Sequence, residues 1–190
     1  MSPKWSILFT CLVVTSEIGT RLLGNGIVAH VTFADPFCKD LSAKLVDAAR
    51  KEKARVHAGG TYLCMEGPQF STRAESKLYR SWGAAVIGMT NLQEAKLARE
   101  AEICFGTLAL ATDYDCWSET AEDVDIEHVL AVLKQNVDLA QRTIRRVAAS
   151  LDERRSCSCA SALKDAIITE RSQISKKIRA DLKPIIGKYL

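Results

Sequence analysis

Short apolar runs alternate with amphipathic segments along most of the chain, and this alternation restricts the choice of fold more than any other feature. Residues 84–89, AAVIGM, have the length of a buried strand, whereas Leu41, Leu45 and Ala49 recur at helical spacing. We expect strands at residues 26–37, 54–66, 84–89 and 104–115, helices at residues 39–53, 71–83, 92–103 and 125–151, and one or two helices before residue 190. The alternation predicts an α/β fold with helices on the faces of a sheet.

Local signals mark the ends of several of these elements. Ser71 or Thr72 is expected to cap the second helix together with Glu75, and Gly83 to end it. Gly59-Gly60 indicates a bend or bulge inside the second strand.

The first residues require a separate interpretation. The apolar stretch Ile7–Val14 is too short to span a bilayer, and no small-x-small cleavage site follows it. We therefore expect a strand there and a cytoplasmic protein. We divide the chain into an atypical segment, residues 1–23, and one domain, residues 24–190.

Charge and composition argue against a nucleic-acid-binding surface. The net charge is +3, the basic residues are scattered, and aromatic residues make up only 6% of the chain. A nucleic-acid surface usually combines a basic stripe with aromatic side chains. We expect neither a nucleic-acid partner nor a membrane partner.

Seven cysteines are present, and an odd number without a regular framework argues against a secreted disulfide scaffold. Cys157 and Cys159 are close enough in sequence to interact. Zinc would need two more ligands, and the sequence offers no partner pair such as CxxC or HxxxH. We therefore expect no metal site; a redox-active or disulfide-forming pair remains open.

Polar residues follow three of the apolar runs. They are Glu66, residues 89–91, and the acids Asp113 and Asp115. Because ligands of α/β sheets bind at the carboxyl ends of strands, these positions predict the site.

Asp113 and Asp115 are the strongest candidates for chemistry. On an extended segment, residues two apart point to the same side, so both carboxylates are expected to converge on one ligand. Repulsion between them should raise one pKa, which suits a general acid, while the ionised partner accepts hydrogen bonds from an amino group. The alternatives are a helix or turn cap and a divalent-metal site.

Four further residues complete a candidate pocket. Met89 suits packing against a ring or sugar, and the Thr90 hydroxyl suits an anion. Phe70 offers a stacking surface, and Ser71 follows it at a helix start that presents N–H donors. Each residue also fits a core or capping role, but together they describe a pocket for a planar, polar heterocycle.

The order of these motifs resembles a known family. EGPQFSTRAE at residues 66–75, GMT at 88–90 and ATDYDCW at 111–117 closely resemble the trimeric purine nucleoside phosphorylase and methylthioadenosine phosphorylase family. The resemblance runs from about Gly24 to the C-terminus. It implies a central mixed β-sheet flanked by helices and a homotrimer or a trimer-based assembly.

The resemblance also implies a pentosyltransferase. The family cleaves a purine N-glycosidic bond with inorganic phosphate as co-substrate, and it needs no cofactor. Asp113 is then the acid at N7 of the purine, and Asp115 holds the amino edge. Phe70 lines the nucleoside pocket, Met89 packs against the sugar, and Thr90 binds phosphate.

Two positions distinguish the branches of the family. Members that cleave 6-oxopurine nucleosides carry Glu and Asn where this chain has Ser71 and Asp113. The chain therefore resembles the branch that converts S-methyl-5'-thioadenosine to adenine and 5-methylthioribose 1-phosphate. A 6-oxopurine phosphorylase is the alternative within the same class.

Residues outside these motifs carry further implied roles. Ile126, Val129 and Leu130 resemble the apolar wall that receives the methylthio group. His30 resembles a residue that reaches into the neighbouring subunit's pocket, with a plain strand-end histidine as the alternative. Cys157-Ser158-Cys159 resembles a pair that is linked to a disulfide and to heat stability in some microbial members.

The chain departs from the family in one respect. The glycine-rich phosphate loop, the Arg-His pair and the Thr-Ala segment of the family's N-terminal half have no counterpart here. We therefore expect an N-terminally truncated chain whose sheet lacks strands. A non-catalytic nucleoside-binding remnant, and a hydrolase that uses water, remain as alternatives.

Overall fold

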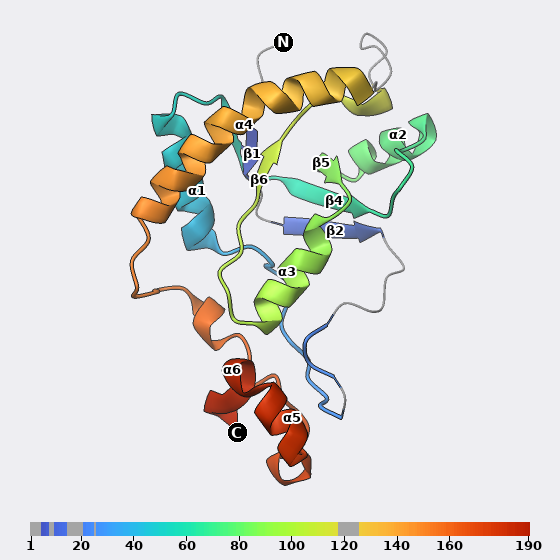
Figure 1. Cartoon of the computed structure of the whole chain (residues 1–190). Coiled ribbons are helices and arrows are strands. Elements are labelled where there is room, and N and C mark those ends of the chain that lie inside the picture. The colour runs from blue at the N-terminus through green and yellow to red at the C-terminus, as the bar shows by residue number, and fades with distance from the viewer. Residues whose placement is uncertain (1–4, 8–9, 15–20, 25, 118–125) are drawn as a thin grey trace.

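The computed structural model describes residues 5–7, 10–14, 21–24, 26–117 and 126–190. Two three-stranded sheets form its centre (Figure 1). Their strand orders are β3 (Val56–Ala58), β1 (Trp5–Ile7), β6 (Leu108–Leu110) and β2 (Thr10–Val14), β4 (Thr61–Met65), β5 (Ala84–Gly88). In the first sheet β1 is parallel to β3 and antiparallel to β6, whereas the second sheet is parallel throughout. The predicted α/β class with mixed strand pairing is confirmed.

The N-terminal strands join segments that lie far away in sequence. In β2, Leu12 pairs with Leu63 of β4, and in β1, Ser6 pairs with both His57 and Ala109. The apolar stretch expected as one strand over residues 7–14 thus supplies strands to both sheets.

Two strand predictions need correction. Residues 26–37 form no strand; their one bridge joins Ala29 to Ile167. Residues 54–66 form two strands in different sheets, because Gly59 and Gly60 take φ values of +84° and +116°. L-residues with a side chain avoid these angles, so the glycine pair turns the chain from one sheet to the other.

The predicted helices are present with shorter bounds. They are α1 (Lys39–Lys51), α2 (Arg73–Ser81), α3 (Asn91–Glu100) and α4 (Ile126–Ala149). Thr72 and Glu75 form the expected capping box of α2, and Gly83 follows the helix at φ +81°. Strong local signals account for this agreement, since a capping box needs only residues of one turn.

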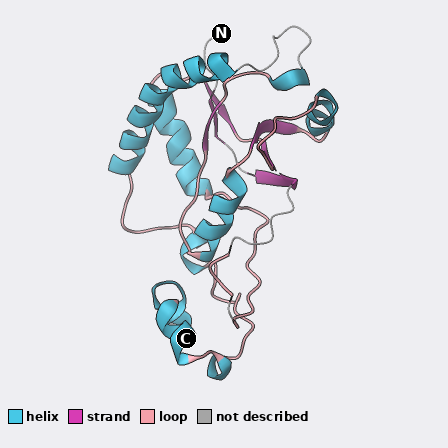
Figure 2. Ribbon diagram, turned by 45° about the vertical axis from the view of Figure 1, so that its right-hand side comes forward, coloured by secondary structure: helices cyan, strands magenta, loops and turns pink. Residues whose placement is uncertain are grey.

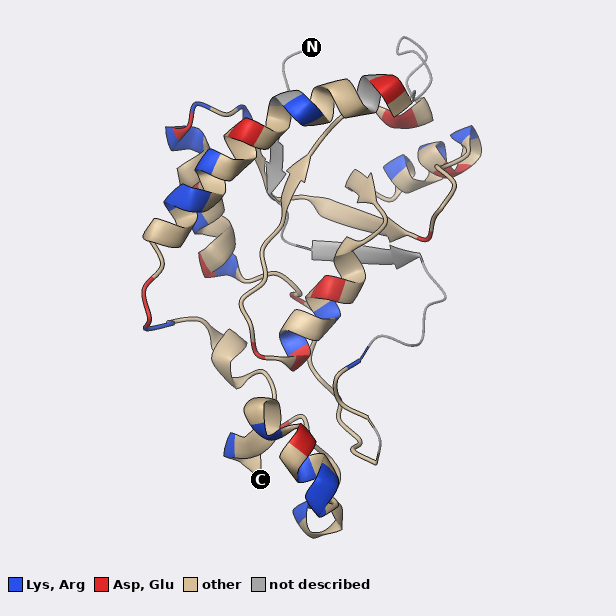
Figure 3. Ribbon diagram, in the orientation of Figure 1, with Lys and Arg blue, Asp and Glu red and all other residues tan. Residues whose placement is uncertain are grey.

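The helices cover the sheets on their apolar faces. α1 packs against α4 and against β1 and β3, with Leu45, Ala49 and Val147 in the shared core. Leu92 of α3 packs with Tyr62 of β4. Charged residues occur on the helices and loops, whereas β4, β5 and β6 contain none (Figure 3).

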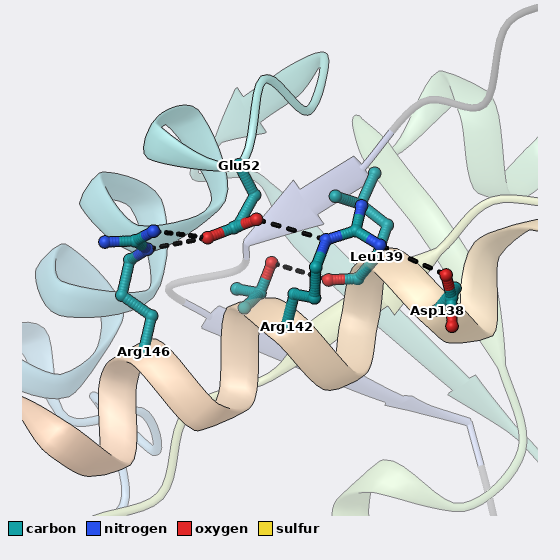
Figure 4. A network of polar contacts seen from close by, with 6 residues as sticks. Glu52, Asp138, Leu139, Arg142 and Arg146 are labelled. Atoms are coloured by element: carbon teal, nitrogen blue, oxygen red, sulfur yellow. Dashed lines mark hydrogen bonds and ion pairs between the residues drawn. The ribbon is translucent and has the colours of Figure 1, made fainter.

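A cluster of polar contacts joins α1 to α4 on the solvent side of this core. Glu52, the C-cap of α1, accepts hydrogen bonds from Arg142 at 3.1 Å and Arg146 at 2.7 Å, while Arg142 also pairs with Asp138 (Figure 4). The two guanidinium groups hold the pKa of Glu52 below its usual value, although burial opposes them. The ionised carboxylate thus links the two helices.

The C-terminal elements form a group apart from the sheets (Figure 2). They are the 3₁₀ turns η2 (Ser158–Ser161), η3 (Arg171–Gln173) and η4 (Gly187–Tyr189) and the helices α5 (Lys176–Asp181) and α6 (Lys183–Ile186). Leu163, Ile174 and Ile186 pack here against Leu23 and Ile27 from the start of the chain. Of the helices described, none has the length and apolarity needed to cross a membrane.

Candidate active site

A cavity of about 590 Å³ lies between β5, α2 and the segment that follows β6. Its lining includes five of the residues that the sequence analysis selected: Phe70, Ser71, Met89, Asp113 and Asp115. These residues come from three separate segments that are joined only by the fold. The apolar strand residues Val86, Ile87 and Leu110 complete its floor.

The two carboxylates are held in different ways. Asp113 accepts hydrogen bonds from the Thr112 hydroxyl at 2.6 Å and from the backbone N–H of Asp115 at 2.8 Å. Asp115 accepts a 2.5 Å hydrogen bond from the hydroxyl of Ser76, which is buried on α2. The Asp115 carboxylate is therefore tied to a helix, and Asp113 is tied to its own loop.

This arrangement corrects the expected geometry of the pair. Asp115 has φ +58° and begins the 3₁₀ turn η1 (Asp115–Trp117), so the segment is not extended. The alternation that would place residues two apart on one side does not hold there. Both carboxylates line the same cavity because the chain turns.

The loop that carries Phe70 is fixed to this turn. The Cys116 thiol donates to the carbonyl oxygen of Ser71 at 3.3 Å, and the Arg73 guanidinium donates to the carbonyl oxygen of Cys116 at 2.5 Å. Phe70 stays 54% exposed beside the cavity. Its ring thus presents a free apolar face at the rim.

Met89 is packed against the same loop. A Cβ on Gly67 would come within 2.7 Å of the Met89 sulfur, closer than real Cβ contacts allow. Gly67 therefore lets the loop approach Met89.

Other predicted residues lie outside this cavity's lining. Thr90 is the exposed N-cap residue of α3, next to Met89. Ile126 and Leu130 are 63% and 58% exposed on α4, and the side chain of Val129 lies outside the described residues. His30 is exposed beside a second hollow of about 440 Å³, which is lined also by Lys96 and Arg99. Among the described side chains, those of Thr90, Ile126, Leu130 and His30 are therefore not in the lining of this cavity.

The sequence analysis missed part of the lining. Trp117 contacts Tyr114 edge to face at 6.0 Å, and the Arg80 guanidinium lies 3.6 Å from the centre of the Trp117 ring. Ser76, which holds Asp115, also went unrecognised. Trp117 belongs to the motif ATDYDCW, so the sequence could have predicted it as a site residue. Ser76 and Arg80 could not be predicted, because in the sequence they are ordinary polar positions of a helix.

Comparison with known proteins decides the family. The sequence profile of the phosphorylase superfamily matches residues 10–149. The chain belongs to the phosphorylase superfamily. The match begins at residue 10, in β2, whereas the resemblance of motifs begins only at about Gly24.

Curated relatives in the phosphorylase superfamily agree with this assignment. The chain is 59% identical over 167 residues to S-methyl-5'-thioadenosine phosphorylase of Geobacter sulfurreducens, covering 88% of this chain and 58% of that protein. It is 50% identical over 175 residues to the same enzyme of Koribacter versatilis, covering 92% and 60%. The chain thus spans about three fifths of the length of these relatives.

Solved structures of the phosphorylase superfamily share the fold. Methylthioadenosine phosphorylase from an Antarctic soil metagenomic library superposes with a TM-score of 0.88 at 38% identity, over 96% of this chain and 65% of that one. Methylthioadenosine phosphorylase from Schistosoma mansoni in complex with adenine gives a TM-score of 0.77 at 26% identity, over 85% and 63%. The predicted nucleoside-phosphorylase fold is confirmed.

Proposed function

We propose that this chain carries the nucleoside-binding part of an S-methyl-5'-thioadenosine phosphorylase. The reaction is reversible phosphorolysis to adenine and 5-methylthioribose 1-phosphate. The observation that supports it most is the cavity, whose lining combines Asp113 and Asp115 with an exposed aromatic ring and a thioether. The names of the curated relatives point to the same reaction.

The cavity suits a purine that must leave as a neutral base. As the glycosidic bond breaks, its electron pair moves to the purine and the sugar becomes oxocarbenium-like. Asp113 gives a proton to N7, which offsets the charge that develops on the base. A phosphate oxygen then forms the new bond to the sugar carbon. No metal or organic cofactor enters this scheme.

The remaining residues position the substrate. Asp115, held by Ser76, accepts a hydrogen bond from the 6-amino group. Phe70 covers the nucleoside, Met89 packs against the sugar, and Thr90 binds phosphate at the start of α3. N–H groups at a helix start favour an anion there.

Selectivity for the methylthio nucleoside is assigned to two features. The carboxyl group of Asp113 donates to N7 through its protonated oxygen and accepts from the 6-amino group, beside Asp115, through its other oxygen, whereas an amide suits a 6-oxo acceptor. Ile126, Val129 and Leu130 form the apolar wall for the 5' substituent, which would leave a 5'-hydroxyl unpaired. Ile126 and Leu130 are exposed, so they are available for a contact that a ligand or a second copy completes.

We propose a homotrimer in the cytoplasm. Five exposed apolar residues follow one line along α4, at spacings of four, three, four and seven residues: Ile126, Leu130, Leu133, Val137 and Ile144. Such a stripe on a helix favours association. His30 lines the second hollow and not this cavity, which fits a role in a neighbouring subunit. The six described cysteines that are free thiols suit a reducing compartment.

Base release tests the function. The purified chain is incubated with S-methyl-5'-thioadenosine and, separately, with inosine, each with and without phosphate. We expect adenine release that depends on phosphate. Release without phosphate would favour a hydrolase, and faster release from inosine would favour a 6-oxopurine phosphorylase. If a folded chain binds adenine but releases no base, it is a binding remnant and the proposed reaction is wrong.

A further inference from the structure

Four cysteine thiols meet in one place, far apart in sequence. Cys38, Cys104, Cys157 and Cys159 have sulfur atoms that all lie within 4.8 Å of one another. Cys38 and Cys159 are buried, and the other two are half-buried. The sequence analysis saw only the Cys157–Cys159 pair and expected two further ligands to be absent. The fold supplies both.

Each thiol is placed by a different local device. Cys38 is the N-cap of α1, and its sulfur accepts the backbone N–H of Leu41 at 3.5 Å. Cys104 follows α3, and the backbone N–H of Cys38 donates to the carbonyl oxygen of Phe105 at 2.7 Å, which holds the two segments together. Cys157 and Cys159 flank the first residue of η2.

We propose that these four cysteines form a structural zinc site. In a tetrahedral site with Zn–S bonds of about 2.3 Å, the sulfur atoms lie about 3.8 Å apart. The sulfur atoms of Cys104 and Cys157 lie 3.3 Å apart and all four lie within 4.8 Å of one another, so the cluster has the size that such a site needs. Four thiolates fill all four positions, so the site is closed, as structural zinc sites are.

The surroundings stabilise negative charge on sulfur. Four thiolates around Zn²⁺ leave a net charge of −2, which calls for nearby donors. Cys38 sits at the positive end of a helix of 13 residues. The Arg155 side chain lies next to Cys104, and the backbone of Cys159 lies next to the Cys157 thiol. Such outer contacts tune the ligands of metal sites.

Zinc binds cysteine as the thiolate, so binding at four cysteines releases protons, and the affinity of the site should fall as pH falls.

The position of the site gives it a structural purpose. Zinc would join the start of α1, the segment after α3 and the segment that leads to the C-terminal helices (Figure 1). The Ser156 hydroxyl donates to Asp40 at 2.8 Å beside it, which reinforces the same junction. The C-terminal group is thereby fastened to the sheet-bearing part.

Metal analysis of the full chain, purified in reductant, is the test. We expect about one zinc per chain in the wild type and a loss of most of it in Cys157→Ser and in Cys159→Ser. Cys116→Ser, which removes a thiol outside the cluster, is the matched control and should keep its zinc. After zinc is removed with a chelator, Co²⁺ should give the intense visible bands of a tetrahedral thiolate site, and added Zn²⁺ should raise Tm.

Several results would overturn the proposal. The proposal is wrong if a folded, reduced wild-type chain takes up neither Zn²⁺ nor Co²⁺. It is also wrong if the purified chain contains iron in place of zinc. Equal zinc loss in Cys116→Ser would overturn it as well. Mass spectrometry of the chain isolated without reductant adds a check: disulfides among the four cysteines, two hydrogens lighter for each bond, would mean that this cluster is a redox cross-link. The wild-type Co²⁺ and Tm results decide the matter even if the serine variants do not fold.

Discussion

Asp113 is the residue on which substrate choice depends in the proposed reaction. Replacing it with Asn removes the carboxyl group that protonates N7 and accepts from the 6-amino group, and puts in its place an amide whose N–H can donate to a 6-oxo group. We expect D113N to weaken adenine binding and to improve hypoxanthine binding, each measured by calorimetry, which needs no turnover. A hydrogen bond to a charged group contributes about 1.5–3 kcal/mol, so the loss for adenine should be roughly tenfold or more.

The matched control for D113N is Asp165→Asn, which removes an exposed carboxylate in the C-terminal part of the chain. It should leave both affinities unchanged. Equal affinities of D113N and the wild type for adenine would show that Asp113 does not contact the base. The stated role in specificity would then have to be given up.

For single residues, the sequence predicted which side chains belong to the site, but it did not predict how they are arranged. The motif ATDYDCW was sufficient to select Asp113 and Asp115. Nothing local encodes the left-handed backbone of Asp115 or its bond to Ser76, a residue 39 positions away. A contact of that range appears only when α2 and η1 are packed together.

At the level of elements, the polar contacts between α1 and α4 converge on one carboxylate, Glu52. Its pKa is lowered in the folded state, so its contribution to stability is present above the usual pKa of glutamate and is lost as pH falls through the folded value. We expect Glu52→Gln to lower Tm at neutral pH, and this difference to shrink as pH falls below the usual glutamate pKa of about 4.3 and to vanish only below the lower folded value. Thermal unfolding across this pH range measures it.

Asp47→Asn is the control for Glu52→Gln. It removes the partner of Lys51 on α1, in an ion pair whose side chains are 64% and 58% exposed. Exposed pairs of this kind contribute little, so Tm should barely change. If both variants had the same Tm at every pH, the contacts of Glu52 with the two arginines would not stabilise the fold.

A second carboxylate fastens the C-terminal elements to the end of α3. Glu102 is 5% exposed and accepts hydrogen bonds from the Leu163 N–H at 2.9 Å and the Tyr189 hydroxyl at 2.6 Å, and it pairs with Lys188. Burial tends to raise its pKa, but these three donors hold it below the usual value. We expect Glu102→Gln to cost roughly 1.5–3 kcal/mol of unfolding free energy.

Denaturant unfolding and limited proteolysis measure this effect. The variant should be cleaved faster between residues 151 and 190, while the exposed control Glu153→Gln should match the wild type. Faster cleavage confined to α1 or α2 would be inconsistent with the role given to Glu102.

Elements with strong local signals were predictable, and those that depend on partners were not. The capping box at Thr72 and Glu75 predicted the start of α2 correctly, because its donors and acceptors lie within one turn. Residues 26–37 have the composition of a strand, but Ile27, Ala29 and Val31 pack against the C-terminal group, and their only β-bridge is the one at Ala29. Cys38 and Cys104 likewise gave no sign of meeting Cys157.

For the whole molecule, the proposed trimer depends on the exposed apolar stripe of α4 being covered by another copy of the chain. The buried face of this helix, with Thr143 and Val147, is distinct from the line that runs through Val137 and Ile144. A lysine placed on that line would put a charge into an interface between copies, which is costly without a partner. We therefore expect Val137→Lys to shift the chain from trimer to monomer in sedimentation velocity, with secondary structure unchanged.

Arg145→Glu is the matched control, since it alters charge on the same helix away from the stripe. It should sediment as the wild type does. A wild-type chain that is monomeric at all concentrations would contradict the trimer, and the stripe would then need a different partner. Because His30 and the α4 wall lie outside the cavity of a single copy, loss of the trimer should also lower nucleoside affinity. A monomeric variant with full nucleoside affinity would show that one copy binds the nucleoside unaided. The roles proposed for His30 and the α4 wall would then be wrong.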